Sequence, residues 1–175
     1  MLLDALSIPS FAVEPGNISE VYDTIAILGE LCGCVDGASQ VIAEMRKKIS
    51  GVEERVQGRE IPLVFWLLGE DPLMTAGPET FVSKIITLGG GKNIFDDVQE
   101  RWPLVSPEQI LLRKPEWILF GDDMGEVTLS GKAFWQLIPA VTEGRVVSVN
   151  GDILYRYGPR LADAVELVAK ILHEK

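Results

Sequence analysis

Residues 61–120 read IPLVFWLLGEDPLMTAGPETFVSKIITLGGGKNIFDDVQERWPLVSPEQILLRKPEWILF, and this stretch decides the fold. Its first eight residues form a near-continuous apolar run, which is typical of a strand covered on both faces. A helix is predicted to start with Pro78 as its first residue and to end at Leu88, where Gly89 would be the C-cap. A second helix, after Ser106, leads into a strand at 117–120. Strands and helices therefore alternate.

The sequence on the C-terminal side repeats this alternation. A strand is predicted at 145–149, with helices at about 132–141 and at 159–173. Three strands separated by helices predict a parallel sheet with right-handed crossovers. The expected fold is an α/β lobe of three layers.

The N-terminal side has a different pattern. Residues 8–15 are interpreted as a short strand that ends at Pro15. Apolar residues at a helical period predict helices over 18–31 and 38–56. The second helix would be a rod of about 28 Å, long enough to bridge two bodies. The full expectation is a parallel-sheet lobe preceded by a long bridging helix.

Composition and charge exclude several classes of partner. Sixteen basic and 26 acidic residues give a net charge of −10, whereas nucleic acids and anionic membrane surfaces require a basic face. No apolar run approaches the roughly 20 residues that span a bilayer. The first 15 residues lack a basic segment and include Asp4 and Pro9, so they are not interpreted as a signal peptide.

The chain lacks the usual residues of catalytic and metal sites. One histidine, His173, cannot build a catalytic triad or a multi-histidine metal site, and Cys32 and Cys34 are interpreted as free thiols. The acidic pairs at 70–71, 96–97 and 122–123 are interpreted as solvated loop residues. The glycines of LGGGKN (88–93) lack the spacing of a phosphate-binding loop and indicate a helix end with a tight turn. We therefore expect no catalytic residue, no metal and no cofactor.

Residues 102–109 contain an aromatic side chain, Trp102, and a carboxylate, Glu108, joined by a short and rigid segment. Ser106 is predicted as an N-cap, Pro107 as the first helical residue, and Gln109 as the partner in a capping box. Trp102 is either a buried packing residue or an exposed plate on which a flat ligand stacks. Glu108 is either an ordinary acid in a first helical turn or a docking residue. The residues alone leave both choices open.

Four motifs carry a resemblance to a known family: DPLMTAGPETF, LGGGKNIF, WPLVSPEQILLRKPEWIL and GDILYRYGPRL, in that order. The chain resembles the C-terminal lobe of the substrate-binding proteins that feed ABC importers of vitamin B12, haem and iron-siderophores. The resemblance implies a remnant of the N-terminal lobe at 1–16, a helical backbone at 17–57 and a ligand-binding lobe at 58–175. About a hundred residues of a typical member would then be missing, so we expect a part of a longer protein or a truncated product.

The same resemblance implies roles for particular residues. Trp102, Asp152 and Arg156 match ligand-contacting positions, and Tyr155 lies in the same segment. Leu68 stands where the family places a ligand-facing aromatic. The expected ligand is a corrinoid, haem or a ferric siderophore. These residues should line one concave face, with Leu68 at its floor.

The resemblance also implies partners and a location. Glu108 matches an acid that docks on the membrane permease. The complete protein is expected to be extracytoplasmic, in the periplasm or as a membrane-anchored lipoprotein, and the isolated lobe could form a homodimer. Two alternatives stay open, since a fold does not fix a function: an interaction or dimerisation module, and a small enzyme on the same scaffold.

Overall fold

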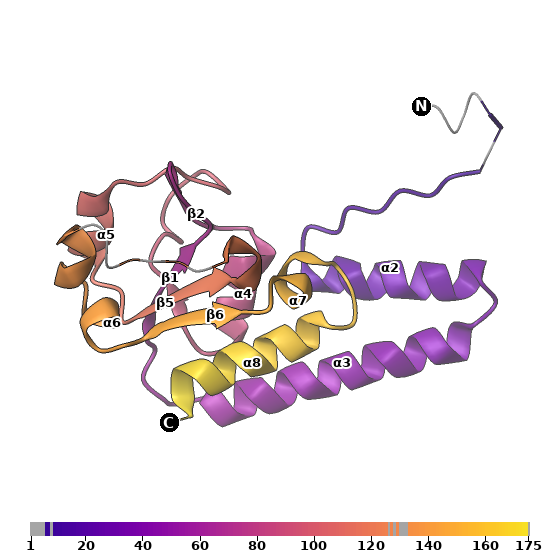
Figure 1. The fold of residues 1–175 in the computed structure, drawn as a ribbon. Helices are drawn as coiled ribbons and strands as arrows, with labels where there is room; N and C mark the ends of the chain where they lie inside the picture. Colours follow the sequence, from indigo (N-terminus) through magenta and orange to yellow (C-terminus); the bar gives the residue numbers. More distant parts are fainter. Residues whose placement is uncertain (1–5, 8, 126, 128, 130–132, 175) are drawn as a thin grey trace.

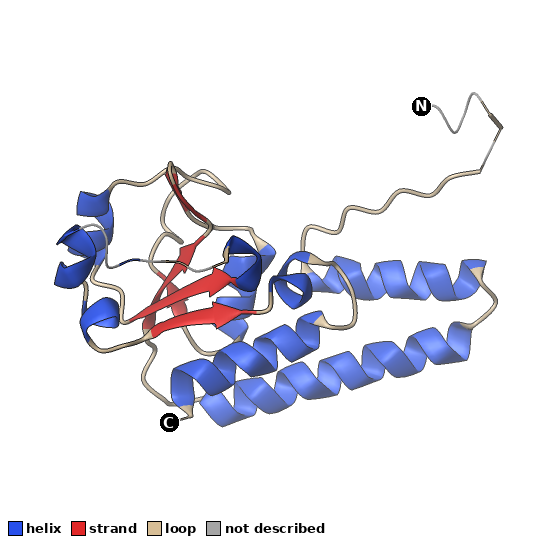
Figure 2. Cartoon of the chain, viewed as in Figure 1, coloured by secondary structure: helices blue, strands red, loops and turns tan. Residues whose placement is uncertain are grey.

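The computed structural model describes residues 6–7, 9–125, 127, 129 and 133–174. A four-stranded sheet lies within the α/β body, with strand order β4-β1-β5-β6 and every pairing parallel (Figure 2). The strands are β1 (Leu63–Leu67), β4 (Lys92–Asn93), β5 (Trp117–Gly121) and β6 (Val146–Val149). The predicted parallel sheet is confirmed.

Strand β1 is buried on both faces, as its apolar run predicts. Val64 and Trp66 pack with helices α3, α4 and α8, whereas Phe65 and Leu67 pack with helices α5 and α6 and the 3-10 turn η3. Each helix thus covers one face, which confirms the three-layer α/β arrangement. The bounds are α3 (Val35–Val56), α4 (Phe81–Leu88), α5 (Pro107–Arg113), η3 (Ala133–Leu137), α6 (Pro139–Thr142) and α8 (Leu161–His173).

A helical hairpin precedes the sheet. Helix α2 (Ile18–Leu31) begins where the Asn17 side chain accepts a hydrogen bond from the backbone N–H of Glu20. The 22 residues of α3 make a rod of about 33 Å, slightly longer than predicted because the helix begins at Val35. Helix α3 packs along α8, and the far end of the hairpin projects beyond the α/β body (Figure 1). The described helices include none that is both long and apolar enough to cross a membrane.

Several sequence-based boundaries are wrong. Residues 9–14 form no strand, because they run without a paired neighbour among the described residues. Helix α4 begins at Phe81 rather than Pro78, since the Thr80 side chain accepts the Ser83 N–H and acts as the N-cap. The helix predicted at 132–141 is divided into η3 and α6 by a break at Ile138, and Lys132 lies outside the described residues.

The glycine-rich segment leads into a strand that the sequence did not predict. Gly89 is the C-cap of α4, as predicted, and Gly90 turns the chain at a φ of +83°. Lys92 and Asn93 then pair with β1 as the edge strand β4, which the sequence pattern did not reveal because it is so short. A small hairpin of β2 (Gly69–Glu70) and β3 (Leu73–Met74) after β1 was also missed.

Candidate functional site

Trp102 lies on a segment that the backbone holds firmly. The Gly77 N–H donates to the Arg101 carbonyl (2.8 Å), and the Thr75 N–H donates to the Pro103 carbonyl (3.2 Å). A Cβ on Gly77 would lie 2.0 Å from the Glu100 carbonyl oxygen, so only glycine permits this approach. Trp102 itself is 45% exposed, which rules out the fully buried alternative.

A small cavity of about 160 Å³, here named the aromatic pocket, lies beside Trp102. Three elements build it: the start of α4, the 101–102 segment, and the region of α7 (Gly151–Tyr155) that follows β6. The Phe81 and Tyr157 rings meet there with centroids 4.6 Å apart. The lining residues are Phe81, Val82, Arg101, Trp102, Leu154, Tyr155 and Tyr157. Such aromatic walls suit a flat, largely apolar ligand.

Tyr155 closes the inner side of the aromatic pocket. Its ring meets Trp66 edge to face, with centroids 6.1 Å apart. Burial raises the pKa of the Tyr155 phenol to about 12, and the nearby Asp123 carboxylate adds to the rise. The buried Trp66 side chain acts on the same group, since hydrogen bonding with Trp66 partly offsets the rise in the Tyr155 pKa.

A second cavity, of about 330 Å³, adjoins the aromatic pocket and shares Phe81 and Arg101 with it. It extends toward the start of α2, and its other lining residues are Gly16, Asn17, Glu79, Thr80 and Lys84. The two cavities form one continuous wall from α2 to α7. The described part of the chain gives neither Arg101 nor Lys84 an acidic partner within salt-bridge distance.

The structure brings together only some of the predicted ligand residues. Trp102 and Tyr155 share the aromatic pocket, but Asp152, Arg156 and Leu68 are absent from its lining. Asp152 and Arg156 form an exposed ion pair on and just after α7, with Nη2 and Oδ1 2.9 Å apart. Leu68 is partly buried against the core, and its backbone N–H donates to the Met74 carbonyl. A ligand role for these three residues stays a prediction.

Glu108 has the surroundings that the sequence predicts. Ser106 is the N-cap of α5, Pro107 is its first residue, and the capping box with Gln109 is complete. The carboxylate is exposed, and no described cation pairs with it. Hydrogen bonding from the Ser106 hydroxyl, and then from the Glu108 backbone N–H, holds the pKa of this carboxyl below its usual range. It is therefore ionised and accessible at neutral pH.

The paired acids in loops are not all merely solvated, and that prediction needs correction. Asp97 pairs with Arg113 (2.7 Å), which lowers the pKa of the Asp97 carboxyl chiefly through this hydrogen bond. Asp96 accepts from the Ser83 hydroxyl (2.7 Å), and Asp122 accepts from the Gly151 N–H at the start of α7 (2.9 Å). These acids fix loops to neighbouring helices, which a sequence pattern of adjacent acids does not reveal.

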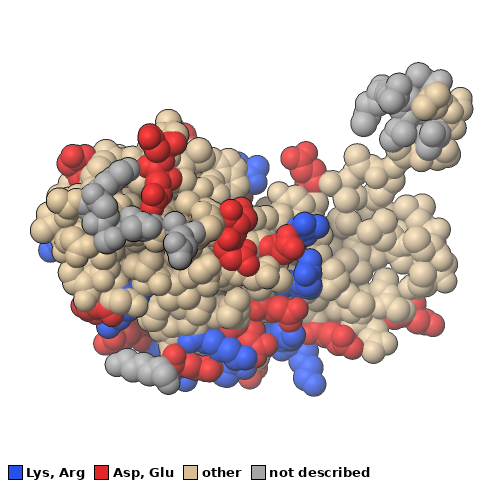
Figure 3. All heavy atoms as spheres, in the orientation of Figure 1, with Lys and Arg blue, Asp and Glu red and all other residues tan. Residues whose placement is uncertain are grey.

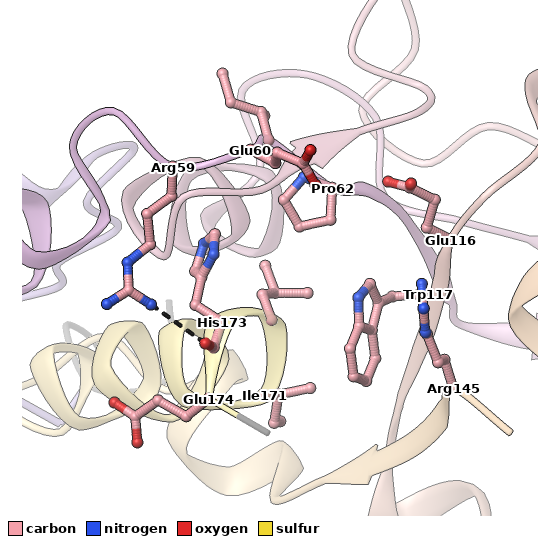
Figure 4. A pocket seen from close by; sticks show the side chains of 11 residues that line it. Arg59, Glu60, Pro62, Glu116, Trp117, Arg145, Ile171, His173 and Glu174 are labelled. Carbon is pink, nitrogen blue, oxygen red and sulfur yellow. Dashed lines mark hydrogen bonds between the residues drawn. The ribbon is translucent and has the colours of Figure 1, made fainter. Parts of the chain in front are cut away.

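A larger pocket of about 590 Å³ lies at the other end of the strands, where β1, β5 and β6 begin (Figure 4). Several of its charged side chains already have hydrogen-bond or ion-pair partners. Arg59 donates to the His173 carbonyl, Arg145 pairs with Glu143, and Glu116 accepts from the Leu63 N–H. His173 is part-buried here. Ligands of α/β folds bind at the carboxyl ends of the strands, so the aromatic pocket is the better candidate.

The described residues contain no group of three or more side chains arranged to hold a metal ion. Cys32 and Cys34 are free and exposed. Sequence reasoning missed Phe81, Arg101 and Tyr157 as site residues. Their neighbours in the sequence gave a signal, since Arg101 directly precedes Trp102 and Tyr157 follows the Tyr155–Arg156 segment, but Phe81 becomes recognisable only through its contact with Tyr157.

Comparison with known proteins is consistent with this geometry. A vitamin B12-binding protein from Yersinia pestis (strain Pestoides F) is 30% identical over 166 residues, which cover 94% of this chain and 57% of that protein. A possible iron-binding, periplasmic solute-binding protein from Staphylococcus epidermidis has a TM-score of 0.85 and 25% identity, over 99% of this chain and 69% of that one. The periplasmic vitamin B12-binding protein of Vibrio cholerae has a TM-score of 0.81 and 26% identity, over 98% of this chain and 67% of that one.

These proteins are named for what they bind, not for a reaction. The chain spans a little over half the length of the curated relatives that it matches. The family model for periplasmic binding proteins matches residues 2–153, which is most of the chain. The chain belongs to the periplasmic binding protein family.

Proposed function

We propose that this chain is the C-terminal lobe of the substrate-binding component of an ABC importer, and that it binds a corrinoid, haem or a ferric siderophore. The observation that carries the proposal is the half-exposed Trp102 beside a pocket walled by Phe81, Tyr155 and Tyr157. Ligands of this kind offer large flat or apolar surfaces that pack on aromatic side chains. The names of the relatives support the same ligand classes.

The proposed division of the chain is the one that the family resemblance implies, and the arrangement of the elements supports it. Residues 1–16 would belong to the other lobe, 17–57 would be the helical backbone, and 58–175 would carry the ligand wall. The parallel sheet with its two covered faces supports the third assignment, and the long α3 supports the second. In the complete protein, a second wall would then face Trp102.

Delivery to a permease is the second part of the proposal. Glu108 is a charged, accessible carboxylate on a rigid, capped helix start, which suits pairing with an arginine on a membrane partner. The complete protein would act outside the cytoplasm, in the periplasm or as a membrane-anchored lipoprotein. The family of the relatives supports the extracytoplasmic location.

A ligand panel tests the binding proposal. The chain is titrated, up to millimolar concentration, into a low fixed concentration of cobalamin, haemin or a ferric hydroxamate siderophore, and absorbance is followed. The aromatic pocket, at about 160 Å³, is smaller than the roughly 300–1,000 Å³ typical of ligand pockets, so it would cover one side of such a ligand. We expect saturable but weak binding of at least one compound, near the millimolar range. No saturable change with any of the three would contradict the proposal.

We also propose that the isolated chain self-associates. Apolar residues at the outer end of the α2–α3 hairpin are strongly exposed, which favours contact with a second copy. They are Ile27 (41%), Leu28 (43%), Leu31 (65%) and Val35 (53%). Sedimentation equilibrium should show a dimer that forms with rising concentration, and that Leu31→Glu weakens. A monomer at all concentrations would contradict it.

A further inference from the structure

The aromatic pocket has one charged residue among the described residues that line it, Arg101. Arg101 is exposed, and the described part of the chain offers it no salt bridge and no side-chain hydrogen bond. Its place is nevertheless fixed, since its carbonyl accepts the Gly77 N–H and the next residue is Trp102. A cation is thus held at the rim of an apolar pocket, without an acidic partner in the part of the chain that the structure describes.

Several cations at the other cavities are paired, unlike Arg101, although the described residues give Lys47 and Arg160 of the groove between α3 and α8 no acidic partner either. Arg156, the next cation along this edge, is paired with Asp152 through both Nε and Nη2. In the pocket of Figure 4, Arg145 pairs with Glu143. In the groove between α3 and α8, Lys48 pairs with Asp163. Pairing uses hydrogen-bond donors of these groups, whereas no described side chain uses the donors of the Arg101 guanidinium.

Arg101 also joins the two cavities of the site. It lines both the aromatic pocket and the adjoining cavity of about 330 Å³, where Lys84 of α4 supplies a second cation without an acidic partner in the described residues. Glu79 is the one described acid that lines this wall. The wall is therefore locally positive in a chain of net charge −10. Figure 3 shows acids scattered over the face in view, with basic groups mainly along its lower edge.

We infer that the ligand of this site carries a carboxylate or a comparable anionic group, which binds Arg101 while its flat body packs on Trp102. Lys84 gives a second anchor for a ligand with more than one such group. A guanidinium binds a carboxylate through two parallel hydrogen bonds, so it selects for the anion's shape as well as its charge. This inference rests on the proposed function, and within it favours porphyrin carboxylates and anionic ferric chelates over uncharged ligands.

Two water-soluble porphyrins of similar size and opposite charge test the inference: tetracarboxyphenyl porphyrin and tetra(N-methylpyridinium) porphyrin. The chain is titrated into each dye at low concentration. The net charge of −10 alone would favour the cationic dye. We expect tighter binding of the anionic dye, with an affinity that falls as salt is raised. Arg101→Gln should weaken its binding about tenfold and change binding of the cationic dye less than about twofold. Arg101→Lys should keep part of the preference.

Lys47→Gln is the matched control, because it removes an equal charge from an exposed position on α3, outside the wall. It should leave both affinities unchanged. The inference is overturned if the wild-type chain binds the cationic dye as tightly as the anionic one, or if Arg101→Gln leaves anion binding intact. Trp102→Ala separates the two proposals: it should weaken both dyes if a flat ligand packs there. A wild-type chain that binds neither dye would contradict the inference and the proposed function together.

Discussion

Replacing Trp102 by alanine removes the side chain on which the proposed ligand packs. Trp102 is 45% exposed, and a full tryptophan side chain offers up to about 250 Å², so roughly 110 Å² is accessible. A ligand stacked on one face would cover about half of that area. At about 25 cal/mol per Å², this burial contributes roughly 1.4 kcal/mol, and ring stacking adds about 1 kcal/mol.

The expected loss on Trp102→Ala is therefore about 2 kcal/mol, or roughly 30-fold in affinity. The measurement is the same absorbance titration, with protein added to a fixed, low concentration of the ligand that the wild-type chain binds best. Trp102→Phe keeps an aromatic face and should lose only a few fold. Thermal unfolding of each variant shows that the fold persists, since the buried part of Trp102 also contributes to stability.

Leu112→Ala serves as the control for loss of exposed apolar surface. Leu112 is 81% exposed on α5, outside the lining of the aromatic pocket, and its truncation should not alter affinity. An unchanged affinity in folded Trp102→Ala, within about twofold for every ligand that binds, would refute the stacking role. An equal loss in Leu112→Ala would show that the effect is not specific to the pocket.

Three further predictions concern docking, ionisation and packing. In the complete protein, Glu108→Lys should leave folding and ligand binding intact but reduce ligand uptake at least about tenfold, whereas unaltered uptake would count against docking. The Tyr155 pKa of about 12, against an ordinary 10.0, means that the neutral phenol favours the folded state; its stabilisation is complete below pH 10 and is lost as pH rises toward 12. The phenolate absorbance of the wild-type chain is titrated with pH, and the titration of Tyr155→Phe is subtracted from it. The difference curve should have its midpoint near pH 12, and a midpoint near pH 10 would contradict the burial of Tyr155. Gly91→Ala would place a methyl 2.7 Å from Leu172 Cδ1 and should destabilise the chain by about 1–3 kcal/mol in denaturant unfolding, whereas Gly51→Ala, which meets nothing within 4 Å in α3, should be neutral or stabilising.

Interactions between residues that are near in the sequence determine several elements of this protein. The apolar run of β1 requires cover on both faces, and the Ser106–Gln109 capping box fixes the start of α5 from four consecutive residues. These features depend on near neighbours in the chain, so the sequence alone predicts them. The same is true of Glu108, whose exposure follows from its place in the first turn of a capped helix.

Other features depend on contacts between distant segments, and only the tertiary structure decided them. The edge strand β4 is two residues long and exists because β1 offers it a partner, whereas residues 9–14 have no such partner among the described segments. The aromatic pocket unites α4, the 101–102 segment and α7, and the Phe81–Tyr157 contact spans 76 positions of sequence, so no local pattern could reveal it. The surroundings of the cations at the rim were only partly readable from the sequence. Asp152 precedes Arg156 by four residues, so the sequence itself suggests that pair, but only the folded chain places Arg101 at the aromatic pocket beside Trp102, without an acidic partner among the described residues.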